Sequence, residues 1–232
     1  MISSKDCSDI SLLIFDLDGT LIDSETDLMH SVNATRAHLA LEPLPRDTIA
    51  SYVGQGVVTL VRRALGSSAP ENVIEQAVDH FLTYYHEHML DNTVLYPGVR
   101  ETLDALQDRK MAVLTNKPVN FSRRILEGLG VTSRFVSIYG GNSFEQKKPD
   151  PAGVFQLMDE TGIPPDRTMM IGDSDIDVQT GRNAGVWTCA VTYGLGSHTL
   201  VHAPADFLLN DFRELCGLLG NGNACKQFEK NS

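Results

Sequence analysis

The alternation of short apolar runs with helical segments constrains the fold of this chain more than any other feature. Five apolar runs end in small or polar residues, at positions 12–15, 111–114, 135–139, 168–171 and 187–191, and "ADFLL" at 205–209 is a possible sixth. Segments with helical periodicity separate most of them, at 99–108, 121–128, 152–161 and 176–184. Strands that alternate with helices normally pair in parallel. The sequence therefore predicts an α/β fold in which helices cover both faces of a parallel sheet.

This rhythm stops between positions 23 and 92. The segment reads as helices at 25–41, 47–52, 57–65 and 71–90, interrupted by "LEPLP", "GQG" and "GSSAP", and it contains no convincing strand. "LYPGV", with Pro97 and Gly98, marks a rigid turn back into the alternating pattern. We therefore expect a core made of residues 1–22 and 92–232, and a helical insertion of residues 23–91 after the first strand.

The residues best suited to chemistry stand just behind the apolar runs. They are Asp16 and Asp18 after the first run, Thr115 and Asn116 after the second, and Asp173, Ser174 and Asp177 after the fourth. A lysine, Lys148 of "KKPDP", lies in a loop before a helix. Ligands of open parallel sheets bind beyond the carboxyl ends of the strands, so these side chains should converge on one edge of the sheet.

Four carboxylates at one edge would repel one another without a compensating positive charge. Hard oxygen ligands, with no His or Cys among them, indicate Mg²⁺ rather than zinc, and the four cysteines of the chain form no CxxC pair. A phosphate group would complete such a site, with Thr115 and backbone N–H groups as donors. A carboxylate beside Mg²⁺ and an electrophilic phosphorus can attack it, giving an aspartyl-phosphate that water hydrolyses.

At this point the motifs resemble a known family. "DLDGT", a downstream Thr, a Lys-Pro pair and "GDSDID" follow the order of motifs in the haloacid dehalogenase-like hydrolase superfamily along the whole chain. The resemblance implies a Rossmann-like core with a small helical cap. It also implies a role for each matching residue: Asp16 as nucleophile and Mg²⁺ ligand, Asp18 as general acid/base that lends its backbone carbonyl to Mg²⁺, Thr115 and Lys148 as holders of the phosphoryl group, Asp173 as a Mg²⁺ ligand, and Asp177 as the residue that orients the metal's surroundings.

Within that superfamily the sequence is most similar to phosphatases. Dehalogenases lack an acid at the place of Asp18, phosphonoacetaldehyde hydrolases carry a small residue there, and sugar phosphomutases usually have an apolar residue in place of Thr20. The segment "SYVGQGVVTLVRRAL" resembles the phosphoglycolate phosphatase branch, which makes 2-phosphoglycolate the leading substrate. The turn of Gly54, Gln55 and Gly56, with Arg62 or Arg63, could read the substrate's carboxylate; the alternative is a simple tight turn with surface charges.

Other functions stay open at this stage. A phosphatase for pyrophosphate, a nucleoside monophosphate or a sugar phosphate has the same motifs, a sugar phosphomutase is a weaker rival, and a non-enzymatic binding module is the weakest. A net charge of −11 disfavours nucleic acid as a partner. The chain has no run of eighteen apolar residues and no basic-then-apolar N-terminus, so we expect no membrane segment and a cytoplasmic location. The sequence does not indicate an oligomeric state.

Overall fold

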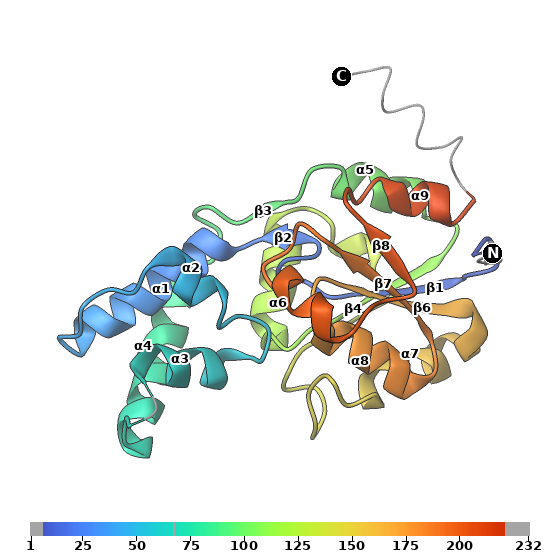
Figure 1. The fold of residues 1–232 in the computed structure, drawn as a ribbon. Helices are drawn as coiled ribbons and strands as arrows, with labels where there is room; N and C mark the ends of the chain where they lie inside the picture. Colours follow the sequence, from blue (N-terminus) through green and yellow to red (C-terminus); the bar gives the residue numbers. More distant parts are fainter. Residues whose placement is uncertain (1–6, 67, 221–232) are drawn as a thin grey trace.

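The core of the protein is a six-stranded parallel sheet (Figure 1). The computed structural model describes residues 7–66 and 68–220. In spatial order the strands are β5 (Ser137–Tyr139), β4 (Lys110–Leu114), β1 (Leu12–Phe15), β6 (Thr168–Gly172), β7 (Trp187–Val191) and β8 (Phe207–Leu209). Every neighbouring pair is parallel. The predicted α/β class is confirmed, including the sixth strand.

Strand β1 shows why its sequence is a continuous apolar run. All four of its side chains are buried, and they alternate between two apolar clusters. Leu13 and Phe15 face the helices α5 (Val99–Ala105), α6 (Val119–Gly128) and α9 (Glu214–Leu218). Leu12 and Ile14 face α7 (Ala152–Thr161) and α8 (Asp175–Ala184). Because both faces are covered, each such side chain contributes about 1.5–3 kcal/mol relative to exposure.

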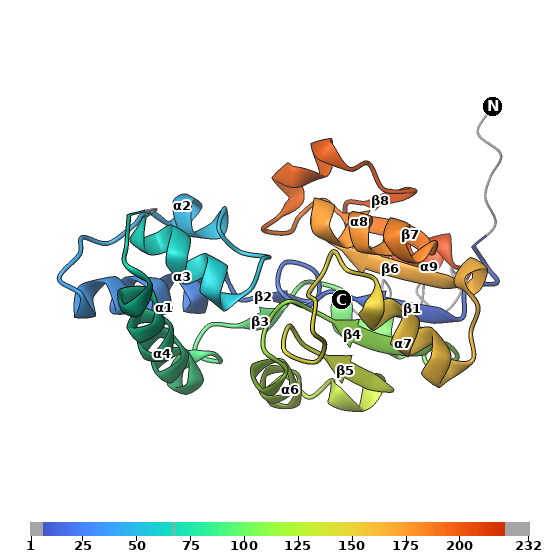
Figure 2. The same cartoon turned by 90° about the horizontal axis from the view of Figure 1, so that it is seen from below.

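Four helices lie beside the sheet, beyond the carboxyl end of β1 (Figures 1 and 2). They are α1 (Glu25–His38), α2 (Arg46–Ala50), α3 (Val57–Leu65) and α4 (Glu71–His88). All four were predicted, and 57–65 has the predicted bounds. The first ends at His38 rather than at position 41, because Ala40 takes a left-handed backbone conformation with φ 55°.

The chain enters and leaves these helices through two paired linkers. β2 (Ile22–Asp23) and β3 (Val94–Leu95) form a small antiparallel pair that the sequence analysis missed, since two-residue strands carry no periodicity. Asp27 of α1 is buried and accepts hydrogen bonds from the backbone N–H groups of Asn92 and Thr93 and from both of their side chains, at 2.7–3.1 Å. The two linkers are thus fastened to each other.

The remaining regular segments that the structure describes are short 3₁₀-helices, at Thr132–Arg134, Pro165–Arg167 and Ser197–His202. Of the helices that the structure describes, none is both long enough and apolar enough to cross a membrane.

Candidate active site

The loop after β1 carries Asp16 and Asp18 into a confined space. The backbone N–H of Asp16 still donates to Ile171 in β6, at 2.8 Å, so this residue continues the strand. Gly19 then turns with φ +82°, and a Cβ at that position would lie 2.2 Å from Oδ2 of Asp173. Only glycine allows this turn and this approach, so the "DLDGT" loop lies directly against the end of β6.

Asp173 and Asp177 come from the end of β6 and the first turn of α8. Oδ2 of Asp173 accepts the backbone N–H of Gly196 at 2.7 Å. Oδ2 of Asp177 accepts the backbone N–H and the hydroxyl of Ser174, at 3.1 and 2.7 Å, in a capping box that starts α8. Asp177 therefore caps its helix, and it also faces the cluster.

Lys148 lies between Asp16, which follows β1, and Asp177, in the first turn of α8. Its side chain is 2% exposed, and its Nζ lies 2.9 Å from Oδ1 of Asp16 and 2.6 Å from Oδ1 of Asp177. Burial alone would lower the pKa of Lys148, but the two carboxylates outweigh burial and raise it above its ordinary value. The lysine therefore stays charged between them.

One lysine does not compensate the three buried carboxylates. Asp16, Asp173 and Asp177 each offer an oxygen within 4.8 Å of the others. The pKa of Asp16 is raised to about 6, because the effects of burial and of Asp177 together exceed the lowering effect of Lys148. Burial also raises the pKa of Asp173, and Asp177 and Asp16 add to this effect. The raised pKa values mean that ionising these carboxylates is unfavourable in the absence of a further positive charge. Because all three offer only oxygen atoms, the group fits a hard divalent cation.

Thr115 and Asn116 at the end of β4 complete the floor of the site. Both are buried. Asn116 donates from Nδ2 to the carbonyl of Gly54, at 2.9 Å, and to the carbonyl of Lys148, at 3.1 Å. Its Oδ1 accepts the backbone N–H of Lys148 at 3.0 Å. Asn116 therefore positions the lysine and fastens the inserted loop to the sheet.

The inserted loop meets the site only in part. Gly54 and Gly56 line the pocket above Asp16. Gln55 is exposed and accepts a hydrogen bond from Arg63 at 2.8 Å, while Arg62 pairs with the exposed Glu71. Among the described residues that line this pocket, neither arginine is present and Gln55 is absent too.

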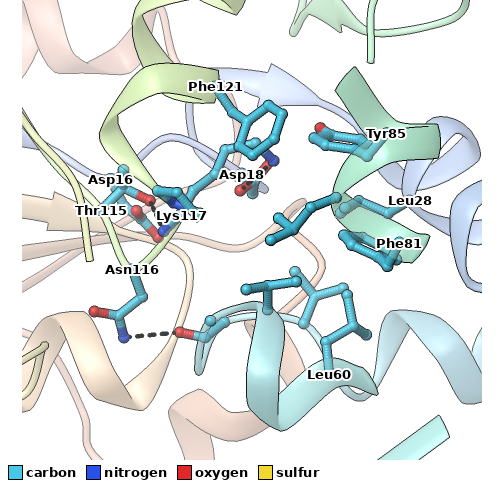
Figure 3. Close-up of a pocket in the computed structure, with 16 residues that line it drawn as sticks. Asp16, Asp18, Leu28, Leu60, Phe81, Tyr85, Thr115, Asn116, Lys117 and Phe121 are labelled. Atoms are coloured by element: carbon cyan, nitrogen blue, oxygen red, sulfur yellow. Dashed lines mark hydrogen bonds and ion pairs between the residues drawn. The ribbon is translucent and has the colours of Figure 1, made fainter. Parts of the chain in front are cut away.

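The pocket itself lies between the sheet edge and the inserted helices (Figure 3). Its floor is polar and consists of Asp16, Asp18, Thr115, Asn116 and Lys117. Its other walls are mainly apolar and consist of Leu28, Val53, Val57, Leu60, Phe81, Leu82, Tyr85, Pro118 and Phe121 with the two glycines. A small ligand with one strongly anionic end fits this division.

Lys117 is the residue that the sequence analysis missed. Its side chain is 5% exposed, and its Nζ donates to both carboxylate oxygens of Asp18, at 2.8 and 3.0 Å. The same Nζ lies 4.7 Å from the ring centroid of Tyr85, in α4. Asp18 also accepts the hydroxyl of Ser24 at 2.5 Å. The available signal was its position directly after Thr115 and Asn116.

Comparisons with known proteins agree with this geometry. Residues 13–191 match the family model described as haloacid dehalogenase-like hydrolase. The chain is 37% identical to the phosphoglycolate phosphatase of Chromobacterium violaceum, over 92% of this chain and 98% of that protein. It is also 37% identical to the phosphoglycolate phosphatase of Agrobacterium fabrum, over 88% and 90%. The crystal structure of a predicted phosphoglycolate phosphatase from Haemophilus somnus 129pt superimposes with a TM-score of 0.86 and 30% identity, covering 90% of this chain and 98% of that one.

Proposed function

Because the chain belongs to the haloacid dehalogenase-like hydrolases, we propose that it is a Mg²⁺-dependent phosphatase that hydrolyses 2-phosphoglycolate through an aspartyl-phosphate. The observation that carries this proposal is the buried group of Asp16, Asp173 and Asp177 around Lys148, of which Asp16 also lines the floor of the adjoining pocket. The substrate follows from the relatives, which are 33–39% identical over most of the chain and are phosphoglycolate phosphatases.

The donor set supports a metal held by Asp16, Asp173 and the backbone carbonyl of Asp18. Asp177 is the less suited ligand, since Lys148 and Ser174 already donate to its two oxygens. The bound ion would supply positive charge beside the phosphoryl oxygens and would favour the ionised form of Asp16.

The chain's own residues would then carry the reaction. Asp16 attacks phosphorus while the bond to the ester oxygen breaks, and Asp18 gives its proton to that leaving oxygen. Water then attacks the aspartyl-phosphate, Asp18 takes the proton from that water, and phosphate leaves with Asp16 restored. Thr115 donates its hydroxyl to the phosphoryl group, and Lys148 holds both Asp16 and the phosphoryl oxygens in place.

We assign residues 23–91 the part of a cap over this site, and residues 1–22 and 92–232 the part of the catalytic core. The apolar wall from the inserted helices would exclude bulk water, so that hydrolysis uses a positioned water. Gly54 and Gly56 would contribute backbone groups, whereas for Gln55 substrate contact stays a prediction. A cytoplasmic location likewise stays a prediction of the sequence.

The test is a panel of phosphate esters with and without Mg²⁺. We expect kcat/KM to be highest for 2-phosphoglycolate and lower for pyrophosphate, a nucleoside monophosphate and a sugar phosphate, with no turnover in EDTA. Phosphate release without an added sugar bisphosphate would exclude a mutase. Asp16→Asn is the matched inactive control. A different preferred ester would overturn the substrate, and no turnover of any ester, a chromogenic one included, would overturn the phosphatase itself.

A further inference from the structure

We propose that Lys117 and Tyr85 form a subsite that recognises a carboxylate on the leaving group of the substrate, an inference that rests on the proposed phosphatase function. The phosphoryl group of 2-phosphoglycolate is separated from its carboxylate by a single CH₂ and the ester oxygen. When the phosphoryl group of the intact substrate lies beside Asp16, the carboxylate must therefore lie inside the same pocket. The walls of this pocket above its floor are mainly apolar. An anion in such surroundings needs a charged or hydrogen-bonding partner.

Lys117 is the one cationic side chain among the described residues that line the pocket. Its Nζ has three protons, and its carboxylate contacts are the two oxygens of Asp18. A donor thus stands beside the group proposed to protonate the leaving oxygen, which is where the substrate's carboxylate must lie.

Tyr85 supplies an independent observation. The residue is 2% exposed, and its buried hydroxyl makes no hydrogen bond of normal distance and angle in the described part of the chain, although it lies close enough to Lys117 for the lysine to affect its pKa. In Figure 3 the hydroxyl end of the ring points toward Phe121 and Asp18. Burial raises the pKa of Tyr85 to about 12, so the hydroxyl keeps its proton and can donate it. A buried donor left unpaired is costly unless a ligand meets it.

This subsite replaces the earlier expectation for the arginines. Arg62 and Arg63 follow Val61 on α3, but their guanidinium groups bond to Glu71 and Gln55, on the exposed side of the helix. Lys117 and Tyr85 come instead from the core and from α4, and they meet only because α4 packs over the sheet edge. The pair could not be seen as a spacing motif.

The experiment compares two esters that differ in one group, 2-phosphoglycolate and 2-hydroxyethyl phosphate. The measured quantity is the ratio of their kcat/KM values. Lys117→Met should lower this ratio roughly 10- to 100-fold, and Tyr85→Phe roughly 3- to 10-fold, since a hydrogen bond to a charged group is stronger from a charged donor than from a neutral one. Lys110→Met, at the exposed start of β4, and Tyr84→Phe, outside the pocket lining, are the matched controls and should leave the ratio within about 2-fold.

The ratio separates recognition from a general defect. Loss of Lys117 also removes the partner of Asp18, which lowers turnover of both esters together and leaves the ratio unchanged. Equal losses for the two esters in both variants would overturn the subsite, and Tyr85→Phe alone decides the matter if Lys117→Met fails to fold. Failure of the phosphatase proposal looks different, because wild type then turns over neither ester. In that case, calorimetric Kd values for the two esters in the Asp16→Asn background test the subsite by the same ratio.

Discussion

Replacing Asp16 by Asn should stabilise the metal-free protein at pH 8 and abolish its turnover. The physical reason is that Asp16 is buried beside two other carboxylates and shares its one lysine partner with Asp177. The pKa of Asp16 is about 6 in the folded protein, against an ordinary value of 3.8. Asparagine has nearly the same shape and carries no charge, so it removes this cost while keeping the packing.

The size of the effect and its pH dependence follow from that pKa. A raised folded-state pKa gives stability that is fully present below 3.8 and is lost as the pH rises through 6. The difference of about 2.2 corresponds to about 3 kcal/mol at pH 8, since one pKa unit is about 1.36 kcal/mol. The advantage of Asp16→Asn should therefore fall to about 1.6 kcal/mol at pH 5 and about 0.6 kcal/mol at pH 4.

The assay is urea unfolding followed by far-UV circular dichroism, in EDTA at pH 8 and pH 5. Saturating Mg²⁺ should cancel or reverse the advantage at pH 8, because wild type then gains the binding energy of the ion. Asp159→Asn, an exposed carboxylate on α7, is the matched control and should change stability by less than about 0.5 kcal/mol. A variant no more stable than wild type in EDTA at pH 8, or an advantage equal at both pH values, would refute the reasoning.

Three further predictions concern the groups around the site. Lys148→Met should destabilise the metal-free protein by about 3–5 kcal/mol in urea unfolding, because it leaves buried carboxylates uncompensated; unchanged stability would contradict this. Gly19→Ala should lower kcat/KM at least about 100-fold by displacing Asp173, whereas Gly217→Ala, with open space around it, should not. Asp27→Ala should cost about 2–4 kcal/mol, since it leaves several donors of the linkers unpaired; a thermal unfolding scan showing no loss would disprove that role for the carboxylate.

Much of the core and its polar edge could be predicted from the sequence, because local patterns determine both. Parallel strands buried on two faces read as continuous apolar runs, and the carboxyl ends of such strands share one edge. Asp16, Asp173 and Lys148 therefore meet where their order along the chain implies. The paired linkers escaped notice because two residues are too few to show a strand period.

The surface above the site was harder to predict, because it depends on how one helix packs on another. Leu60, Val61 and Ala64 are the buried residues of α3. The two arginines at 62 and 63 lie between them in sequence but are on the other side of the helix, so helical spacing could have excluded them from the pocket. No such local spacing relates Lys117 to Tyr85.

The two ends of the pocket thus have different physical origins, and this has a consequence for specificity. The phosphoryl end is built by sheet geometry and by glycines that admit no side chain, so its chemistry tolerates little change. The opposite wall is an ordinary helix packing surface, where apolar side chains can be exchanged at a modest cost in stability. Lys117 connects the two ends of the pocket. It binds Asp18 at the phosphoryl end, and its Nζ also lies against the ring of Tyr85 in the helix wall. A change of α4 at position 85 should therefore alter which leaving group is accepted while Asp16 and Lys148 stay in place.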